Sequence, residues 1–123
     1  MAKGKKLADF SMNLTTITFT PGPGASVINE GNFEGTATGG FGTVAGTARF
    51  VGGKSGTFDY CGTAWMENGD ELTSTGSGSY ESTGKHHWKT EAVLRLSDGS
   101  SIVSEGEIDL AARSWTGKVS EWN

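Results

Sequence analysis

Glycine-bearing turns divide the whole chain into short segments in which polar and apolar residues alternate. They are expected at Pro21–Gly24, Thr38–Gly40, Gly52–Ser55, Asn68–Asp70, Ser82–Lys85 and Ser97–Ser100, with a weaker seventh break at Ala111–Ser114. Alternation with a period of two is typical of strands, and short connections join antiparallel neighbours. Seven breaks predict eight strands, over residues 8–20, 26–37, 41–51, 56–67, 71–81, 85–96, 101–110 and 114–122. The predicted fold is therefore all-β, a single eight-stranded antiparallel up-and-down β-barrel.

The length of 123 residues fits one domain. Twenty glycines help to explain a hydrophobic content of only 34%, and four tryptophans and six phenylalanines argue against disorder. We therefore expect one barrel domain over residues 1–123. Within it, residues 1–7, which include Lys3, Lys5 and Lys6, are expected to form a flexible basic amino terminus.

The charge and the hydropathy of the chain exclude several classes of partner and location. A net charge of −4 disfavours nucleic acid, whose binding depends on phosphate neutralisation by Lys and Arg. No apolar run approaches the ~20 residues of a membrane span, so no membrane partner is expected. Asp9, Ser11 and Asn13 interrupt the only stretch resembling a signal-peptide core. The single cysteine excludes an internal disulfide and fits a cytoplasmic location.

Period-two alternation assigns the more apolar face of each segment to the barrel interior. In the first segment the apolar face switches between Leu14 and Ile17, which predicts a bulge near Thr15–Thr16. The side chains expected inside are Phe10, Met12, Leu14, Val27, Asn29, Phe33, Val44, Ala48, Phe50, Phe58, Tyr60, Ala64, Met66, Leu72, Ser74, Tyr80, His86, Trp88, Thr90, Ala92, Leu94, Leu96, Ile102, Ser104, Ile108, Leu110, Trp115 and Val119. His87 and Val103 are expected to face outward.

This eight-strand meander resembles the calycin-type barrels, which include the lipocalins, the fatty-acid-binding proteins and the allene oxide cyclase and dirigent-like barrels. The resemblance is architectural and covers most of the chain. The Gly-x-Trp signature of lipocalins is absent near the first strand, and no segment matches the helical lid of fatty-acid-binding proteins. The resemblance thus implies a barrel interior that can hold a ligand, and it implies no catalytic residue.

A mostly apolar interior with a few polar groups is the usual form of a small-molecule site. A tyrosine hydroxyl can polarise a carbonyl and a histidine can move a proton near neutral pH. The candidate catalytic residues are therefore Tyr60, Tyr80 and His86. The candidate ligand-binding residues are Phe58, Trp88, Trp115, Asn29 and Met66.

Three functions remain open at this point. The first is binding of a hydrophobic or aromatic small molecule. The second is a cofactor-free isomerase or cyclase that moves a proton with Tyr or His. The third is a structural subunit with a filled interior. The polar groups also have a simpler interpretation. The tyrosine hydroxyls then reach solvent at the barrel rim, and His86 caps the mouth.

Neither a metal nor a cofactor is expected. His86 and His87 are adjacent in a predicted strand, so they point to opposite faces and cannot readily share one ion. Cys61 shares its face with Asp59 and Glu67, whose carboxylates oppose formation of a reactive thiolate.

A homo-oligomer, most simply a dimer, is expected from two tryptophans. Trp65 and Trp122 share faces with polar residues, which places both indoles on the barrel exterior. Burial of these indoles against a partner would remove their apolar surface from water, which favours association.

Overall fold

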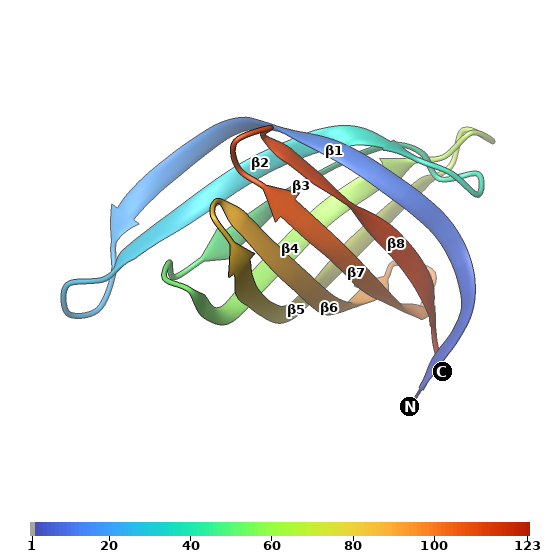
Figure 1. The fold of residues 1–123 in the computed structure, drawn as a ribbon. Helices are drawn as coiled ribbons and strands as arrows, with labels where there is room; N and C mark the ends of the chain where they lie inside the picture. The colour runs from blue at the N-terminus through green and yellow to red at the C-terminus, as the bar shows by residue number, and fades with distance from the viewer. Residues whose placement is uncertain (1) are drawn as a thin grey trace.

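A computed structural model describes residues 2–123 as one closed barrel in which each strand is antiparallel to the next and β8 returns to β1 (Figure 1). The strands are β1 (Lys3–Pro21), β2 (Val27–Ala37), β3 (Gly42–Phe50), β4 (Ser55–Trp65), β5 (Glu71–Gly84), β6 (His87–Leu96), β7 (Ser101–Asp109) and β8 (Ser114–Trp122). This confirms the predicted fold class. No helix able to cross a membrane occurs in residues 2–123.

The longest strand, β1, closes the barrel. Phe10 lies opposite Ala37 of β2 on one side and opposite Gly117 of β8 on the other. The strand begins at Lys3, and Lys3 and Lys6 pair with β8. The first strand therefore begins earlier than the expected residue 8, because the carboxyl-terminal strand supplies hydrogen-bond partners that the local sequence does not reveal. Met1 lies outside the described residues.

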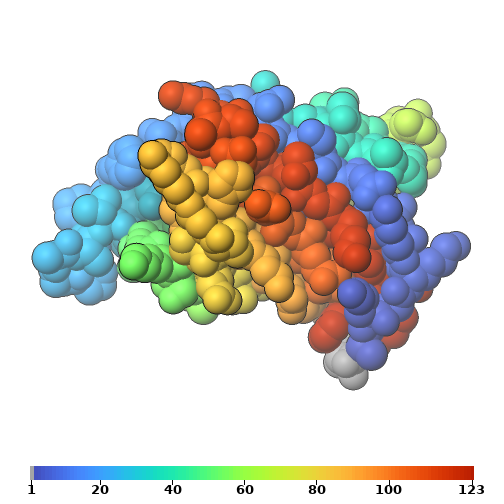
Figure 2. Space-filling view, viewed as in Figure 1, coloured from blue at the N-terminus to red at the C-terminus, as the bar shows by residue number. Residues whose placement is uncertain are grey.

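The predicted bulge in β1 is confirmed by a shift of the β1–β2 register between Leu14 and Thr16. The extra residue changes the phase of the strand, so Ile17 and Phe19 border the same interior space as Leu14. Beyond the bulge, the β1–β2 hairpin projects past the neighbouring turns, as the blue and cyan ribbon of Figure 1 and the space-filling view of Figure 2 show.

Bulky rings fit inside this small barrel because glycines lie beside them. Tyr60 of β4 lies against Gly46 of β3 and Gly62 of its own strand, and a Cβ at either glycine would collide with the Tyr60 ring. Phe10 lies in the same way against Gly106 and Gly117, on β7 and β8. The high glycine content is thus part of how the interior accepts aromatic side chains.

Most of the predicted interior is confirmed. Phe33, Phe58, Leu94 and Trp115 are among the buried core residues. Val103 is an exception, because it faces outward from β7 yet is only 3% exposed. Lys3 of β1 reaches across β8 to form an ion pair with Glu105 of β7 at 3.1 Å, so the start of β1 helps to cover this part of the outer wall.

Candidate functional site

The barrel interior contains two cavities rather than one. The larger cavity, of about 260 Å³, lies at the end where the β1–β2, β3–β4, β5–β6 and β7–β8 turns gather. We call it the wide cavity; its lining includes Leu14, Asn29, Phe50, Tyr80, Trp88 and Ile108. Ile17, Phe19 and Leu110 also line it and are 41%, 61% and 41% exposed, so the wide cavity opens to the surface.

The second cavity, of about 90 Å³, lies at the opposite end of the barrel, beside the termini. We call it the narrow cavity; its lining includes Met12, Tyr60, Ala64, Leu94, Ile102 and Val119. An engineered cavity of roughly 150 Å³ can hold benzene. The narrow cavity is smaller than that, so it suits at most a very small occupant.

Trp115 stands between the two cavities. Its indole is 3% exposed and packs edge-on against Phe33 and Tyr60, with ring centroids 5.0 and 5.8 Å apart. Its Nε1–H donates a hydrogen bond to Thr90 Oγ1 at 3.0 Å, which fixes the ring in one orientation. Because Phe33 lines the wide cavity and Tyr60 lines the narrow cavity, this cluster forms the partition.

Further aromatic rings connect the partition to the mouth of the wide cavity. Phe58 lies 5.9 Å from Trp115 and stacks on Phe50 at 5.1 Å, and Phe50 contacts Tyr80 edge-on at 5.2 Å. Phe50 and Tyr80 give the wide cavity an aromatic wall, and Phe58 packs behind it on the side of the narrow cavity. Such geometry favours a flat apolar molecule, since offset and edge-to-face contacts add to the gain from burial.

The structure divides the predicted site residues between the two cavities. Tyr80, Asn29 and Trp88 line the wide cavity, whereas Tyr60, Phe58 and Trp115 line the narrow one. The single cavity implied by the strand pattern is therefore two cavities separated by the Trp115 cluster. Tyr60 and Tyr80 do not share a cavity.

Val27 was expected inside the barrel, but it lies at the start of β2, is 49% exposed and lines neither cavity. Two of the predicted site residues also lie outside both cavities. His86 is exposed and belongs to the two-residue β5–β6 turn, with a positive φ of 60°. β5 continues to Gly84, beyond the expected end at residue 81, so the turn falls later than predicted. Met66 follows the last residue of β4, is only half-buried and lines neither cavity. Neither side chain is placed to touch a molecule inside the barrel.

The wide cavity has few polar side chains. The Tyr80 hydroxyl donates a hydrogen bond to the Gly52 carbonyl at 2.7 Å, so it joins the wall to the β3–β4 turn. Burial raises the pKa of Tyr80, which keeps the hydroxyl protonated as a donor. Asn29 makes no side-chain hydrogen bond within residues 2–123, so its carboxamide can both donate to and accept from a ligand.

Tyr60 is the corresponding polar residue of the narrow cavity. Burial raises the pKa of Tyr60 to about 12, and the neighbouring Cys61 adds to the shift. At neutral pH its hydroxyl is therefore a neutral donor and cannot act as a base. Its neighbours Thr63, Ser74 and Ser104 are the other polar residues of this cavity.

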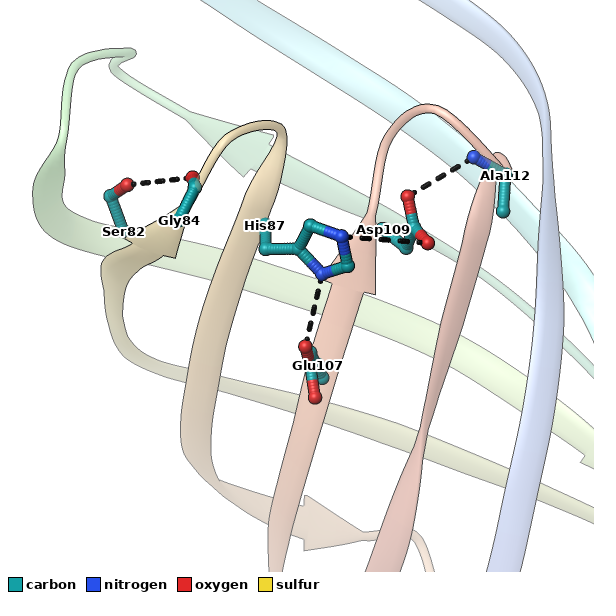
Figure 3. A network of polar contacts seen from close by, with 6 residues as sticks. All are labelled: Ser82, Gly84, His87, Glu107, Asp109 and Ala112. Atoms are coloured by element: carbon teal, nitrogen blue, oxygen red, sulfur yellow. Dashed lines mark hydrogen bonds and ion pairs between the residues drawn. The ribbon is translucent and has the colours of Figure 1, made fainter.

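A separate polar network lies on the outer wall, where His87 sits between two carboxylates of β7 (Figure 3). Its Nδ1 lies 3.1 Å from Glu107 Oε1 and its Nε2 lies 3.7 Å from Asp109 Oδ2. Asp109 also accepts a hydrogen bond from the Ala112 backbone N–H at 3.1 Å. No group of three or more His, Cys, Asp or Glu side chains in residues 2–123 is placed so that it could hold a metal ion. The outward placement of His87 is confirmed, and its partners are cross-strand neighbours.

Several residues of the wide cavity were not singled out as site residues by the sequence. Ile17 and Phe19 line the wide cavity because the bulge changes which face of β1 points inward. The switch of the apolar face after Leu14 was the sequence signal that could have identified them. Phe50 and Ile108 were placed inside by alternation alone, without any indication of which end of the barrel they would line.

Comparison with known proteins identifies no relative of this chain: no family model matches it, and neither does any curated protein or any solved structure. The architecture is consistent with a calycin-like barrel, and the geometry of the interior is the remaining guide to function.

Proposed function

We propose that the protein binds a small hydrophobic or aromatic molecule in the wide cavity. The observation that carries this proposal is an apolar space of about 260 Å³ that opens to the surface through exposed Ile17, Phe19 and Leu110. Small-molecule pockets begin at roughly 300 Å³, so this cavity suits a ligand of one or two rings.

Asn29 is the group we assign to ligand orientation. It is the one carboxamide among the wide-cavity residues, and it lies on β2 opposite Phe19 and Phe50. A ligand with an apolar body and one hydroxyl or carbonyl would fill the cavity and meet the Asn29 amide. A buried hydrogen bond of this kind contributes about 1 kcal/mol, or roughly fivefold in affinity.

Titration calorimetry with 2-naphthol tests the proposal. Ile108 and Ile102 are both buried on β7, and each lines one cavity. Ile108→Phe fills the wide cavity and is expected to weaken binding at least tenfold, whereas the matched variant Ile102→Phe is expected to change it less than twofold. Equal effects of the two variants, or no binding to the unchanged protein, would contradict the proposal.

The orienting role of Asn29 has its own test. Asn29→Leu keeps the volume and removes the amide, so 2-naphthol is expected to bind about fivefold more weakly. Naphthalene, which has no hydroxyl, is the control ligand and is expected to bind the Leu variant at least as well. An equal loss for both ligands would show that the substitution altered the shape of the cavity instead.

The isomerase or cyclase alternative has less support. It would move a proton with Tyr60, Tyr80 or His86, but the two tyrosines line different cavities and His86 lies in an exposed turn. Any proton transfer inside the barrel would rest on a tyrosine alone. Turnover of a bound compound that falls tenfold in Tyr80→Phe would favour the enzyme.

The proposed assembly and location follow from the earlier arguments. Trp65 is 48% exposed on the outer wall, which supports a homodimer that covers it, whereas Trp122 is partly buried within the chain itself. A sedimentation mass of one chain at micromolar concentration would contradict the dimer. The single cysteine keeps the cytoplasm as the proposed location.

A further inference from the structure

Exposed apolar side chains gather at one end of the barrel. Among residues 2–123, seven large hydrophobic residues are exposed, and two of them, Trp65 and Val93, lie on the outer wall. The other five surround the mouth of the wide cavity or the hairpin and turn beside it, and we call them the apolar rim: Ile17, Phe19, Val27, Val51 and Leu110. Clustering of this kind marks an interaction surface, because single exposed hydrophobic residues are scattered on ordinary surfaces.

Basic side chains occupy the turns around the same mouth. The β3–β4, β5–β6 and β7–β8 turns carry Lys54, Lys85 and Arg113, one each, and all three are exposed. We call them the basic turns. None of the three forms an ion pair with a described residue. Their charges are therefore available to an external partner.

The turns at the opposite end have the other sign. Glu67 and Asp70 lie in the β4–β5 turn and Asp98 lies in the β6–β7 turn. A nine-residue strand such as β3 extends about 30 Å, and tilt in a barrel reduces this to a height of roughly 20–25 Å. That height exceeds the Debye length of about 8 Å at physiological salt, so the distant acidic turns are screened from a partner at the mouth.

We propose that the wide-cavity end of the barrel docks onto the surface of an anionic lipid bilayer. The apolar rim would enter the headgroup and acyl boundary, and the basic turns would meet the anionic headgroups. The three cations lie in three separate turns around the mouth, which fits a plane of negative charge better than a single anion. Glu81, Glu107 and Asp109 lie on the strands behind these turns, and the last two face His87.

This proposal revises the expectation that no membrane is a partner. That expectation rested on the lack of a spanning apolar run, and a surface contact needs no span. The docking also stands apart from the proposed ligand, because it depends on the outside of the mouth rather than on an occupied cavity. Failure of vesicle binding would leave the 2-naphthol result untouched, and the reverse also holds.

Co-sedimentation with vesicles tests the docking. The full chain is expected to bind vesicles of phosphatidylcholine with phosphatidylglycerol and to release them as salt rises, with little binding to pure phosphatidylcholine. The variant Lys54→Gln with Lys85→Gln and Arg113→Gln is expected to lose on the order of a hundredfold in partitioning, since each cation near an anionic surface contributes about fivefold.

The matched control removes the same charge from the other end of the barrel. Lys3→Gln, Lys5→Gln and Lys6→Gln together change the net charge equally, and they are expected to alter partitioning less than threefold. Equal losses in the two triple variants would overturn the proposal, because they would show a response to net charge alone.

The apolar rim is tested by Phe19→Ser, which is expected to weaken vesicle binding at least fivefold without unfolding a side chain that is already 61% exposed. Circular dichroism checks the fold. Sedimentation without lipid provides the competing outcome: if the unchanged protein self-associates and Phe19→Ser abolishes that association, the rim is covered by a second copy of the chain and the lipid proposal is wrong.

Discussion

The two ends of this barrel are built from the same eight strands and the same period-two pattern, yet they differ in what they leave open. At the narrow-cavity end, aliphatic residues from β6 and β7, such as Leu94 and Ile102, fill most of the interior and leave a cavity of only about 90 Å³. At the wide-cavity end, the bulged β1 turns outward with β2, and about 260 Å³ remains. Alternation thus decides which side chains point inward, while side-chain size and one bulge decide where a cavity remains.

The largest expected effect comes from removing the partition between the ends. Trp115→Ala deletes the indole that contacts Phe33 and Tyr60 and leaves the buried Thr90 hydroxyl without its partner. We expect a loss of about 3–5 kcal/mol in the free energy of unfolding, measured by urea denaturation. Trp65→Ala, on the exposed outer wall, is the control and should cost less than ~1 kcal/mol. Similar losses in the two variants would show that Trp115 is no structural boundary.

Alkaline pH is expected to distinguish the two ends through their tyrosines. Folding raises the pKa of Tyr60 from 10.0 to about 12, so the folded chain keeps a proton that the unfolded chain releases. Stability is then complete below pH 10 and falls as pH rises toward 12, by about 2–3 kcal/mol at the end of this range. Urea denaturation as a function of pH should show this loss in the unchanged protein and a smaller loss in Tyr60→Phe. Parallel curves for the two proteins would remove Tyr60 as the cause.

Near neutral pH, the hydroxyl of Tyr80 is expected to contribute more to the free energy of unfolding than the hydroxyl of Tyr60. Tyr80→Phe breaks the hydrogen bond to Gly52 and should cost about 1 kcal/mol in thermal or urea unfolding. Tyr60→Phe removes a hydroxyl that makes no hydrogen bond within residues 2–123, so its effect should stay within ~0.5 kcal/mol. A larger cost for Tyr60→Phe would place an unrecognised polar partner in the narrow cavity.

The smallest effect on stability is expected at the mouth of the wide cavity. Phe19 is 61% exposed, so Phe19→Ser should change the free energy of unfolding by less than ~0.5 kcal/mol. Leu94→Ala, at the filled end, provides the contrast and should cost about 2–5 kcal/mol. If Phe19→Ser destabilised the protein as much as Leu94→Ala, the hairpin would belong to the core rather than to a binding surface.

The sequence was sufficient for the fold because strand periodicity and turn chemistry are local properties. The switch of apolar phase after Leu14 even located the bulge in β1. The sequence did not show that His86 lies in a turn, because the residue with positive φ in that turn is this histidine and not the glycine two residues earlier. The division of the interior into two cavities could not be predicted either, because it depends on contacts between Trp115 and rings from other strands.

The pairing of β1 with β8 has a consequence for how the chain folds. All seven hairpins of the meander can form locally, but closure joins Lys3 to Trp122 and the backbone of Ala2 to that of Asn123. Contacts this distant along the chain form late and slow the overall rate. During synthesis, β1 must wait for the last strand to emerge, and until then both β1 and β7 carry unpaired edges of the kind that chaperones protect.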